Sequence, residues 1–567
     1  MSPRTRLLIL QIAFVLAVCA FLFFFGLGAF GLVGADEPRY AQIAREMFER
    51  HDWIVPTLNG QPWLEKPVLL YWKEITGYMF FGVLDWAARV PAAAHATALV
   101  LAVFFFTRRF RPGSELDAAM ITASSAAIIG FGRGASTDML LAAYLSTALL
   151  AWWVWHQTAK RLWLAGFYVL LALGTLAKGP VAPALAVLIV AAYAALRRDA
   201  KVFLRSIWLP GFALFFAVAL PWFVAVQVKV PQFFRVFFLE HNLERFGTNL
   251  YQHAQPFWYY IPVFLVSTLP WTVFTIPALA QTFRDGVRQV RGDSQAEQSQ
   301  AEDHDRLALF LLLWTLIPIV FFSISRSKLP GYILPSVPAS ALLTTVYLHR
   351  MQSISRLKLM LHSLLCGIVV LAAMLTPWYF ALRPESRCGF FCMLRILAQN
   401  VPDKTTAWIA GTVGIVMILV LIIVRKQGLR SLHFATLIPV IMALAFVLRP
   451  AARVLDQTLS ARAVNAAVDA QLRQRSITPP SLAIFQAPKQ RDLAYGLNFY
   501  GNRPVTYYES DEGNGPRDLP HGVPSETHVV ITKVGNGDAV RAVVGPRPVT
   551  ALGGFPAQHL EFFLVQK

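Results

Sequence analysis

Charged residues are scarce in this chain, and cysteines are scarcer still. Only 15% of its 567 residues are Asp, Glu, Lys or Arg, whereas 56% are hydrophobic. Soluble domains carry about 25% charged and about 45–50% apolar residues, so the composition argues against an ordinary globular enzyme. The apolar content is also far too high for a disordered chain. Four cysteines are too few for a disulfide-dense scaffold.

Acidic residues are too few to balance the basic ones, and the formal net charge is +19. A nucleic-acid-binding protein would gather such an excess on one polar face. Here Lys and Arg occur instead in short groups between long apolar runs. This pattern is typical of a polytopic membrane protein, in which basic residues mark the cytoplasmic side.

Thirteen apolar runs are predicted to cross the membrane. A helix needs about 20 mostly apolar residues to span the hydrocarbon core of a bilayer. The first run follows Arg4 and Arg6, but it is too long for a signal peptide and is interpreted as a retained helix. The predicted spans are 7–31, 89–107, 116–132, 137–156, 162–178, 180–196, 207–228, 257–281, 307–324, 331–349, 358–381, 405–424 and 431–448.

A further stretch, 67–84, is apolar but carries Lys73 and Glu74 at its centre. If it crossed the membrane, every basic group after the first would lie outside. If it stays out, all of them lie on the cytoplasmic side, as basic residues prefer. The stretch is therefore predicted to belong to a long outside loop, 32–88, as helices in the interface. The basic groups are Arg4/Arg6, Arg108/Arg109/Arg111, Lys160/Arg161, Arg197/Arg198/Lys201/Arg205, Arg284/Arg288/Arg291, Arg350/Arg356/Lys358 and Arg425/Lys426/Arg430.

Two domains follow from this layout. Residues 1–448 form a membrane domain, and residues 449–567 form a small extracytoplasmic one. The tail has short alternating runs that are typical of strands. The fold class is thus mainly α, a polytopic helical membrane protein with a small mixed α/β C-terminal domain. The predicted strands are SLAIF (481–485), HVVITKV (528–534) and HLEFFLVQ (559–566), and the polar stretch 289–306 is predicted to be a flexible cytoplasmic linker.

The outside loops carry the residues best suited to chemistry. Asp36 and Glu37 are neighbours at the point where the first span ends. With Pro38 they also resemble the start of a helix, which is the structural alternative. Glu65 and Lys66 lie between aromatic residues, either as a surface ion pair of little energetic weight or as a contact for an anionic headgroup.

The order of these and later motifs resembles one known family. Together they resemble the lipid A 4-amino-4-deoxy-L-arabinose transferases, which are GT-C glycosyltransferases of the protein O-mannosyltransferase superfamily. The resemblance covers most of residues 1–350, and the tail is similar only in being a small extracytoplasmic domain. The motifs are the Asp36–Glu37 pair, WIVP (53–56), EKP (65–67), Asp138, LAKGP (176–180), EHNLERF (240–246), QHAQPFWYYIPVFL (252–265), LPW (269–271) and SKLPGYILP (327–335).

The resemblance implies an enzyme of the bacterial inner membrane whose active site faces the periplasm. Such enzymes move the sugar from undecaprenyl phosphate to a phosphate of lipid A, which lowers the binding of cationic antimicrobial peptides. Membrane lipids thus supply both substrates to an expected monomer, and no nucleic acid is involved. No nucleotide cofactor is expected, since the sequence has no P-loop and no dinucleotide fingerprint.

Phosphate chemistry in such a site calls for outside cations. The departing lipid phosphate develops negative charge, which Arg or Lys would stabilise. A tyrosine hydroxyl would add a hydrogen bond, although Tyr332 also suits an aromatic belt. Lys178 ends a predicted helix, where it either complements the helix dipole or contacts phosphate. The residues expected to bind the donor or its phosphate are Arg39, Lys66, Arg245, Lys328, Tyr332 and Tyr40.

Asp36, Asp138 and Glu37 are the expected catalytic residues. A lipid A phosphate is already an anion at neutral pH, because its second pKa is about 6, so Asp36 would orient the acceptor or contact the amine of the sugar. With a hydroxyl acceptor, as in protein O-mannosylation, Asp36 would instead be a general base. Asp138 is either a helix cap or, by the resemblance, part of the active-site cavity.

The resemblance also places a divalent metal near Glu65 and His253, residue types that suit zinc. From the residues alone, a single loop histidine equally suits hydrogen bonding, and there is no HExxH or paired-cysteine motif. Cys388 and Cys392 lie in an outside loop, where the periplasm permits a disulfide. Their C-x3-C spacing would be awkward on a regular helix, so this pairing stays open.

A transporter is the main alternative of another class. It would place ionisable residues within its spans and use broken helices, often in inverted repeats. In this sequence the charges cluster in the outside loops and no internal repeat is visible. The pattern therefore favours an enzyme that works at the membrane surface.

Overall fold

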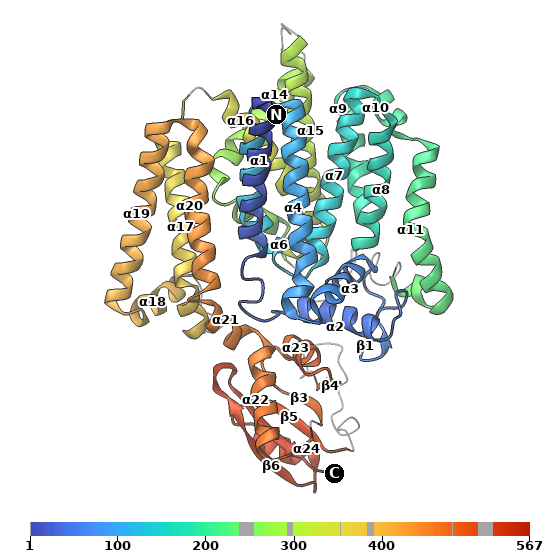
Figure 1. Cartoon of the computed structure of the whole chain (residues 1–567), viewed down its shortest axis with the longest axis vertical. Coiled ribbons are helices and arrows are strands. Elements are labelled where there is room, and N and C mark those ends of the chain that lie inside the picture. The colour runs from blue at the N-terminus through green and yellow to red at the C-terminus, as the bar shows by residue number, and fades with distance from the viewer. Residues whose placement is uncertain are drawn as a thin grey trace.

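A helical bundle and a smaller α/β domain make up the computed structural model of the chain (Figure 1). The N-terminus lies near the end of the bundle that is remote from the α/β domain. The end of the bundle that meets this domain is called the outer end below. The structure describes residues 2–237, 255–291, 299–351, 353–382, 390–478, 480–508 and 526–567.

Long apolar helices form the bundle. Within the described residues, nine are long and apolar enough to cross a membrane, and each coincides with a predicted span. Helices suit this environment because lipid offers no hydrogen bonds to an open backbone. They are α1 (Pro3–Cys19) with η1 (Ala20–Phe24), α4 (Asp85–Phe110), α7 (Thr137–Thr158), α8 (Arg161–Lys178), α11 (Leu209–Lys229), α15 (Ser299–Ile324), α17 (Arg356–Leu382), α19 (Asp403–Gln427) and α20 (Leu432–Leu448).

The other four predicted spans are helical too, but they are short or broken. The amide of Ala126, at one break, donates to the carbonyl of Leu269, at another, over 3.0 Å. The two broken helices thus satisfy backbone groups that a continuous helix would satisfy internally. The elements are α5 (Glu115–Ser124) with α6 (Ala126–Gly132), α9 (Val181–Leu196), η3 (Phe257–Tyr259) and α13 (Tyr260–Ser267) with α14 (Thr272–Arg291), and η4 (Pro330–Ile333) with α16 (Ser336–Arg350).

The polar stretch 289–306 is more helical than predicted. α14 continues to Arg291, and α15 begins at Ser299, before its apolar part. Ala, Gln and Glu in this stretch are good helix formers, so the polar composition does not prevent helix extension. The prediction of a flexible linker is therefore wrong at both ends of the stretch, and residues 292–298 lie outside the described part.

The outside loop 32–88 folds into two helices that lie across the outer end of the bundle (Figure 1). They are α2 (Asp36–Glu49) and α3 (Leu69–Phe81), with the strand pair β1 (Thr57–Leu58) and β2 (Gln61–Pro62) between them. At 13 residues α3 is too short to span a bilayer, as predicted. Its Glu74 is fully buried, and burial raises the pKa of this carboxyl well above its usual value.

The C-terminal domain is built on a five-stranded sheet of order β4-β3-β5-β7-β6. β3, β4 and β5 are parallel, and β7 runs antiparallel to β5 and β6. The three predicted strands are confirmed, while β4 and β6 were not predicted. The elements are α21 (Ala452–Leu459), α22 (Ala461–Gln474), β3 (Ser481–Phe485), α23 (Gln490–Gly501), β4 (Val505–Tyr508), β5 (His528–Lys533), α24 (Gly537–Val544), β6 (Val549–Phe555) and β7 (Leu560–Val565).

Polar contacts join this domain to the outer end of the bundle. Arg462 of α22 pairs with Asp85, the first residue of α4, at 3.0 Å. The hydroxyl of Tyr500 donates to the same carboxylate over 3.1 Å. Arg45 of α2 donates to the carbonyl of Phe499 over 2.6 Å. The domain is therefore held against α2, the helix that begins with the predicted catalytic residues.

Candidate active site

A cavity of about 380 Å³ lies where α2, the membrane helices and the C-terminal domain meet. Carboxylates, cations and tyrosine rings from separate parts of the chain line it together. Such a mixture suits a substrate that carries both negative and positive charge. The predicted residues in its lining are Asp36, Arg39, Tyr40, Glu65, Lys66, Asp138 and Tyr332, and Lys178, Arg491 and Asp492 join them.

Asp36 and Arg39 form one side of the cavity. Both lie in the first turn of α2, and Nη2 of Arg39 donates to Oδ1 of Asp36 over 2.5 Å. The Asp36 side chain is 55% exposed, whereas that of Arg39 is 5% exposed. Asp36 therefore remains accessible to a substrate although it is paired.

Aromatic rings surround the guanidinium of Arg39. Its Cζ lies 5.1 Å from the ring centres of both Tyr40 and Trp63, and 5.5 Å from that of Tyr495 in α23. Burial alone lowers the pKa of Arg39, but its neighbours, Asp36 among them, outweigh burial and raise that pKa above its usual value. The group stays charged and is held in place by rings from both domains.

Asp138 and Lys178 form the opposite side of the cavity. Asp138 lies in the first turn of α7, Lys178 is the last residue of α8, and the two side chains form an ion pair. The ammonium of Lys178 also lies 4.7 Å from the ring centre of Tyr332. Ser136, rather than Asp138, is the N-cap of α7, and Asp138 lines the cavity.

Gly331 allows η4 to approach Asp138 closely on this side of the cavity. A Cβ atom on Gly331 would lie 2.6 Å from Oδ1 of Asp138 and 2.8 Å from the ring of Phe131. Both distances are shorter than van der Waals contact, so a larger residue would displace the carboxylate. The glycine of the KLPG motif therefore lets η4 pack directly on Asp138.

The C-terminal domain adds Arg491 and Asp492 to the lining. Both lie in the first turn of α23, which packs against α2. Burial raises the pKa of the Asp492 carboxyl and Asp36 adds to this rise, while Lys489 and Arg491 oppose it. The carboxyl groups of Asp36 and Asp492 therefore interact electrostatically across the junction of the two domains.

Glu37 turns away from the cavity, and its expected catalytic role is corrected to a structural one. Neighbouring residues on a helix point about 100° apart, so Glu37 faces the bundle while Asp36 faces the cavity. Its Oε2 accepts from Nη2 of Arg89 (2.7 Å) and the amide of Val33 (2.9 Å). Its Oε1 accepts from Nε of Arg89 (3.1 Å) and the amide of Ala135 (2.8 Å). Both oxygens are thus fully occupied.

Lys328, like Glu37, does not line the cavity. It is 5% exposed, and its ammonium donates to the carbonyls of Ser325 (2.5 Å) and Gln255 (3.0 Å). These bonds fix the turn that leads into η4. Its expected role in phosphate binding is therefore corrected to that of a turn-stabilising residue.

Some predicted residues cannot be placed. Three of them lie outside the described part of the chain: Arg245, His253 and Cys388. Cys392 is described and is disulfide-bonded. Glu65, the other predicted metal ligand, lines the cavity. Within the described residues, no group of three or more His, Cys, Asp or Glu side chains could hold a metal ion. The metal therefore stays a prediction.

An apolar groove of about 420 Å³ lies beside the cavity. Pro330 lines the groove, while Leu329 and Tyr332, its neighbours around η4, line the cavity. The rest of the groove comes from α6 and α13, the parts of the two broken helices nearest the breaks. Its lining is apolar apart from Ser267, and consists of Ala126, Ala127, Gly130, Phe131, Pro262, Val263, Val266, Ser267 and Pro330.

Sequence reasoning missed the contribution of the C-terminal domain. The available signal was the charged run KQRD (489–492) in a tail that otherwise reads as strands and turns. The pairing of Lys178 with Asp138 was missed too, because the two residues lie 40 positions apart. Lys178 does lie at a helix end, as predicted, but the prediction did not include its ion pair with Asp138.

Comparisons with known proteins show what this chain is similar to. The family model for dolichyl-phosphate-mannose-protein mannosyltransferases matches residues 8–237. An undecaprenyl phosphate-alpha-4-amino-4-deoxy-L-arabinose arabinosyl transferase of Edwardsiella ictaluri is 32% identical over 358 residues, which are 60% of this chain and 61% of that protein. A protein of the same name from Pseudomonas aeruginosa is 32% identical over 60% of this chain and 59% of its own length. The sequence matches thus span about 60% of these relatives.

Structural similarity extends over nearly the whole chain. The crystal structure of ArnT from Cupriavidus metallidurans bound to undecaprenyl phosphate matches with a TM-score of 0.74 and 22% identity, over 99% of this chain and 98% of that one. The apo structure of the same protein matches with a TM-score of 0.72.

The fold is therefore that of the solved ArnT structures, a bundle of apolar helices with a small C-terminal sheet, as the sequence predicts. The sequence relatives are named as aminoarabinose transferases, so the resemblance that the motifs indicate is confirmed.

Proposed function

We propose that this chain transfers 4-amino-4-deoxy-L-arabinose from undecaprenyl phosphate to a phosphate of lipid A, at the periplasmic face of the bacterial inner membrane. The cavity carries the proposal, because carboxylates and cations meet there beside an apolar groove at one end of a membrane bundle. The names of the relatives support the sugar and its polyprenyl carrier.

The lipid phosphate of the donor is the leaving group, and it departs next to the cations that line the cavity. The bond that breaks joins the anomeric carbon of the sugar to a phosphate oxygen, and the electron pair departs with that oxygen. Arg39 and Lys66 line the cavity and can stabilise the developing charge. The rings around Arg39 hold the guanidinium in advance, so little reorganisation is needed during the reaction.

The acceptor phosphate attacks without losing a proton first. Its second pKa is about 6, so at neutral pH it already carries the negative oxygen that bonds to the anomeric carbon. Asp36, with a largely exposed carboxylate, can contact the ammonium of the sugar or orient the acceptor. Asp138 is held by Lys178 on the opposite side and can contact the same sugar.

The apolar groove suits the polyprenyl chain of the donor. Its lining is almost entirely apolar, and its Pro330 is next to cavity residues in the chain. A lipid chain in the groove would leave its phosphate at the cavity. The substrate would thus arrive from the membrane, without a soluble nucleotide sugar.

We also propose that a divalent cation binds at Glu65. Its carboxylate lines the cavity next to Lys66, and carboxylate and imidazole suit zinc. Glu65 and His253 would hold the ion, which would offer positive charge near the phosphates. We expect the purified chain to retain zinc and Glu65→Gln to retain clearly less, as elemental analysis would show. Equal metal contents in the two proteins would contradict this part of the proposal.

The function is tested in cells that lack their own aminoarabinose transferase but make abundant donor. Expression of this chain should add aminoarabinose to lipid A, which mass spectrometry of the extracted lipid would detect. Unmodified lipid A, with the chain present in the membrane, would contradict the proposal. Mannosylated protein in the same cells would point to a hydroxyl acceptor, as in the mannosyltransferases of the matching family model.

A further inference from the structure

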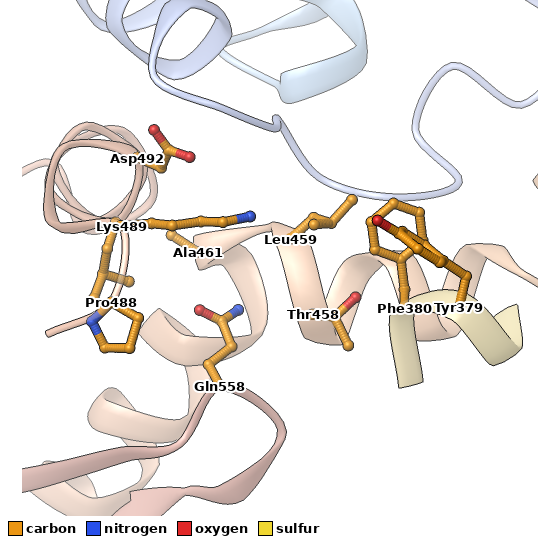
Figure 2. A pocket seen from close by; sticks show the side chains of 10 residues that line it. Tyr379, Phe380, Thr458, Leu459, Ala461, Pro488, Lys489, Asp492 and Gln558 are labelled. Atoms are coloured by element: carbon orange, nitrogen blue, oxygen red, sulfur yellow. The ribbon is translucent and has the colours of Figure 1, made fainter. Parts of the chain in front are cut away.

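A second cavity, of about 240 Å³, lies between the C-terminal domain and the outer end of α17 (Figure 2). Two aromatic rings from the end of that long helix, Tyr379 and Phe380, line one side. The other side belongs to the C-terminal domain and carries Lys489 and Asp492. The remaining lining residues are Thr458, Leu459, Ala461, Pro488, Leu493 and Gln558.

The polar groups of this cavity are arranged around its open space. Figure 2 shows the ammonium of Lys489 extending across the cavity toward Leu459, on the way to the rings of Tyr379 and Phe380. The side-chain amide of Gln558 donates to the carbonyls of Gln457 and Ser460 (3.0 and 2.9 Å), so its position is fixed. One cation, the Asp492 carboxylate, a fixed amide and two aromatic rings thus face one space.

The backbone at Lys489 is unusual for a residue with a side chain. Lys489 has φ +50°, in the left-handed region, directly before α23 begins. Residues other than glycine adopt this region infrequently. A lysine, rather than a glycine, thus occupies a left-handed position in the loop that borders the second cavity.

The second cavity adjoins the active site. Asp492 lines both, and α23 holds Arg491 on the active-site cavity. The apolar groove is formed instead by α6, α13 and η4, and it shares no lining residue with the second cavity among the described residues. The second cavity and the apolar groove therefore border the active-site cavity through different residues.

We propose that the second cavity binds the phosphorylated sugar headgroup of the acceptor lipid, with Lys489 as its phosphate contact. This inference rests on the proposed function. The ammonium suits a phosphate, the rings suit the face of a sugar, and the amide oxygen of Gln558 suits a sugar hydroxyl. Tyr379 is 39% exposed at the end of a membrane helix, a position that a lipid headgroup can reach from the bilayer.

Binding of lipid A to the purified full chain in nanodiscs tests this inference without any catalysis. Lys489→Gln should raise the Kd for lipid A roughly tenfold, since it removes one contact to a charged group. Lys489→Arg should keep most of the affinity. Gln replaces Lys at the same positive φ, so the backbone strain is similar in the variant. Lipid A stripped of its phosphates should bind to the unmodified chain at least as weakly as intact lipid A binds to Lys489→Gln.

Lys533→Gln is the matched control, because Lys533 is an exposed lysine of the same domain outside both cavities. It should leave the Kd unchanged, and Lys489→Gln should leave the Kd for undecaprenyl phosphate unchanged. An unchanged Kd for lipid A in Lys489→Gln would overturn the inference, even if the chain transfers the sugar. Loss of binding in Lys489→Gln, in a chain that transfers no aminoarabinose, would support the inference while refuting the proposed function.

Discussion

Asp36→Asn should lower the rate of sugar transfer on the order of a hundred- to a thousand-fold. Asparagine keeps the size of the side chain and one oxygen for Arg39, but it removes the negative charge that faces the cavity. The largest loss is expected in kcat, because the carboxylate acts on groups whose charge or position changes during the reaction. Transfer by purified protein, with donor and lipid A in vesicles, measures this effect.

The change should leave folding almost intact. The Asp36 side chain is 55% exposed and its ion pair with Arg39 lies at the cavity surface. Glu49→Gln is the matched control, since Glu49 is another α2 carboxylate that pairs with an arginine, Arg45, away from the cavity. If Asp36→Asn transfers sugar as fast as Glu49→Gln does, Asp36 is only the start of a helix.

Arg89→Met should destabilise the protein by about 3–5 kcal/mol, the usual effect of leaving one member of a buried ion pair without its partner. The Arg89 and Glu37 side chains are 3% and 10% exposed. Arg89 also donates to the carbonyls of Leu27, Phe30 and Gly31, over 2.7, 2.8 and 2.9 Å. The arginine thus fixes the connection between the first span and α2, and with it the position of Asp36.

Thermal unfolding in detergent measures this loss. Arg541→Met is the control, because the exposed ion pair between Arg541 and Asp538 should contribute little. The double variant Glu37→Gln with Arg89→Met should be more stable than Arg89→Met alone, since it no longer buries an unpaired charge. Equal melting temperatures for Arg89→Met and the unmodified chain would contradict the structural role of this pair.

The membrane helices could be predicted from the sequence because apolar length is a local property. Each predicted span is helical, and the stretch around Lys73 and Glu74 stays out of the bundle as α3. The breaks were not predicted, since the contact between Ala126 and Leu269 joins residues far apart in sequence. The helical ends of the stretch 289–306 do not follow from its polar composition, because polar helix formers such as Gln and Glu occur in both linkers and helices.

In the active-site cavity, too, local contacts could be predicted from the sequence and contacts between distant residues could not. Asp36 and Arg39 lie within one helical turn, so their proximity follows from their spacing. The sequence alone could not tell which of Asp36 and Glu37 faces the cavity, because both suit the first turn of a helix. The roles of Glu37 and Lys328 depend on partners such as Arg89 and on the fold of a turn. Arg491 reaches the cavity only because a separate domain packs on α2.

Under the proposed function, this chain joins a sugar from a polyprenyl phosphate to the phosphate of a glycolipid. The most direct measurement combines the purified chain with undecaprenyl phosphate-linked aminoarabinose and lipid A in vesicles, and follows the acceptor by mass spectrometry. We expect one aminoarabinose on lipid A, none on dephosphorylated lipid A, and release of undecaprenyl phosphate in equal amount. Intact donor and unmodified lipid A, with a folded chain that binds both lipids, would contradict it.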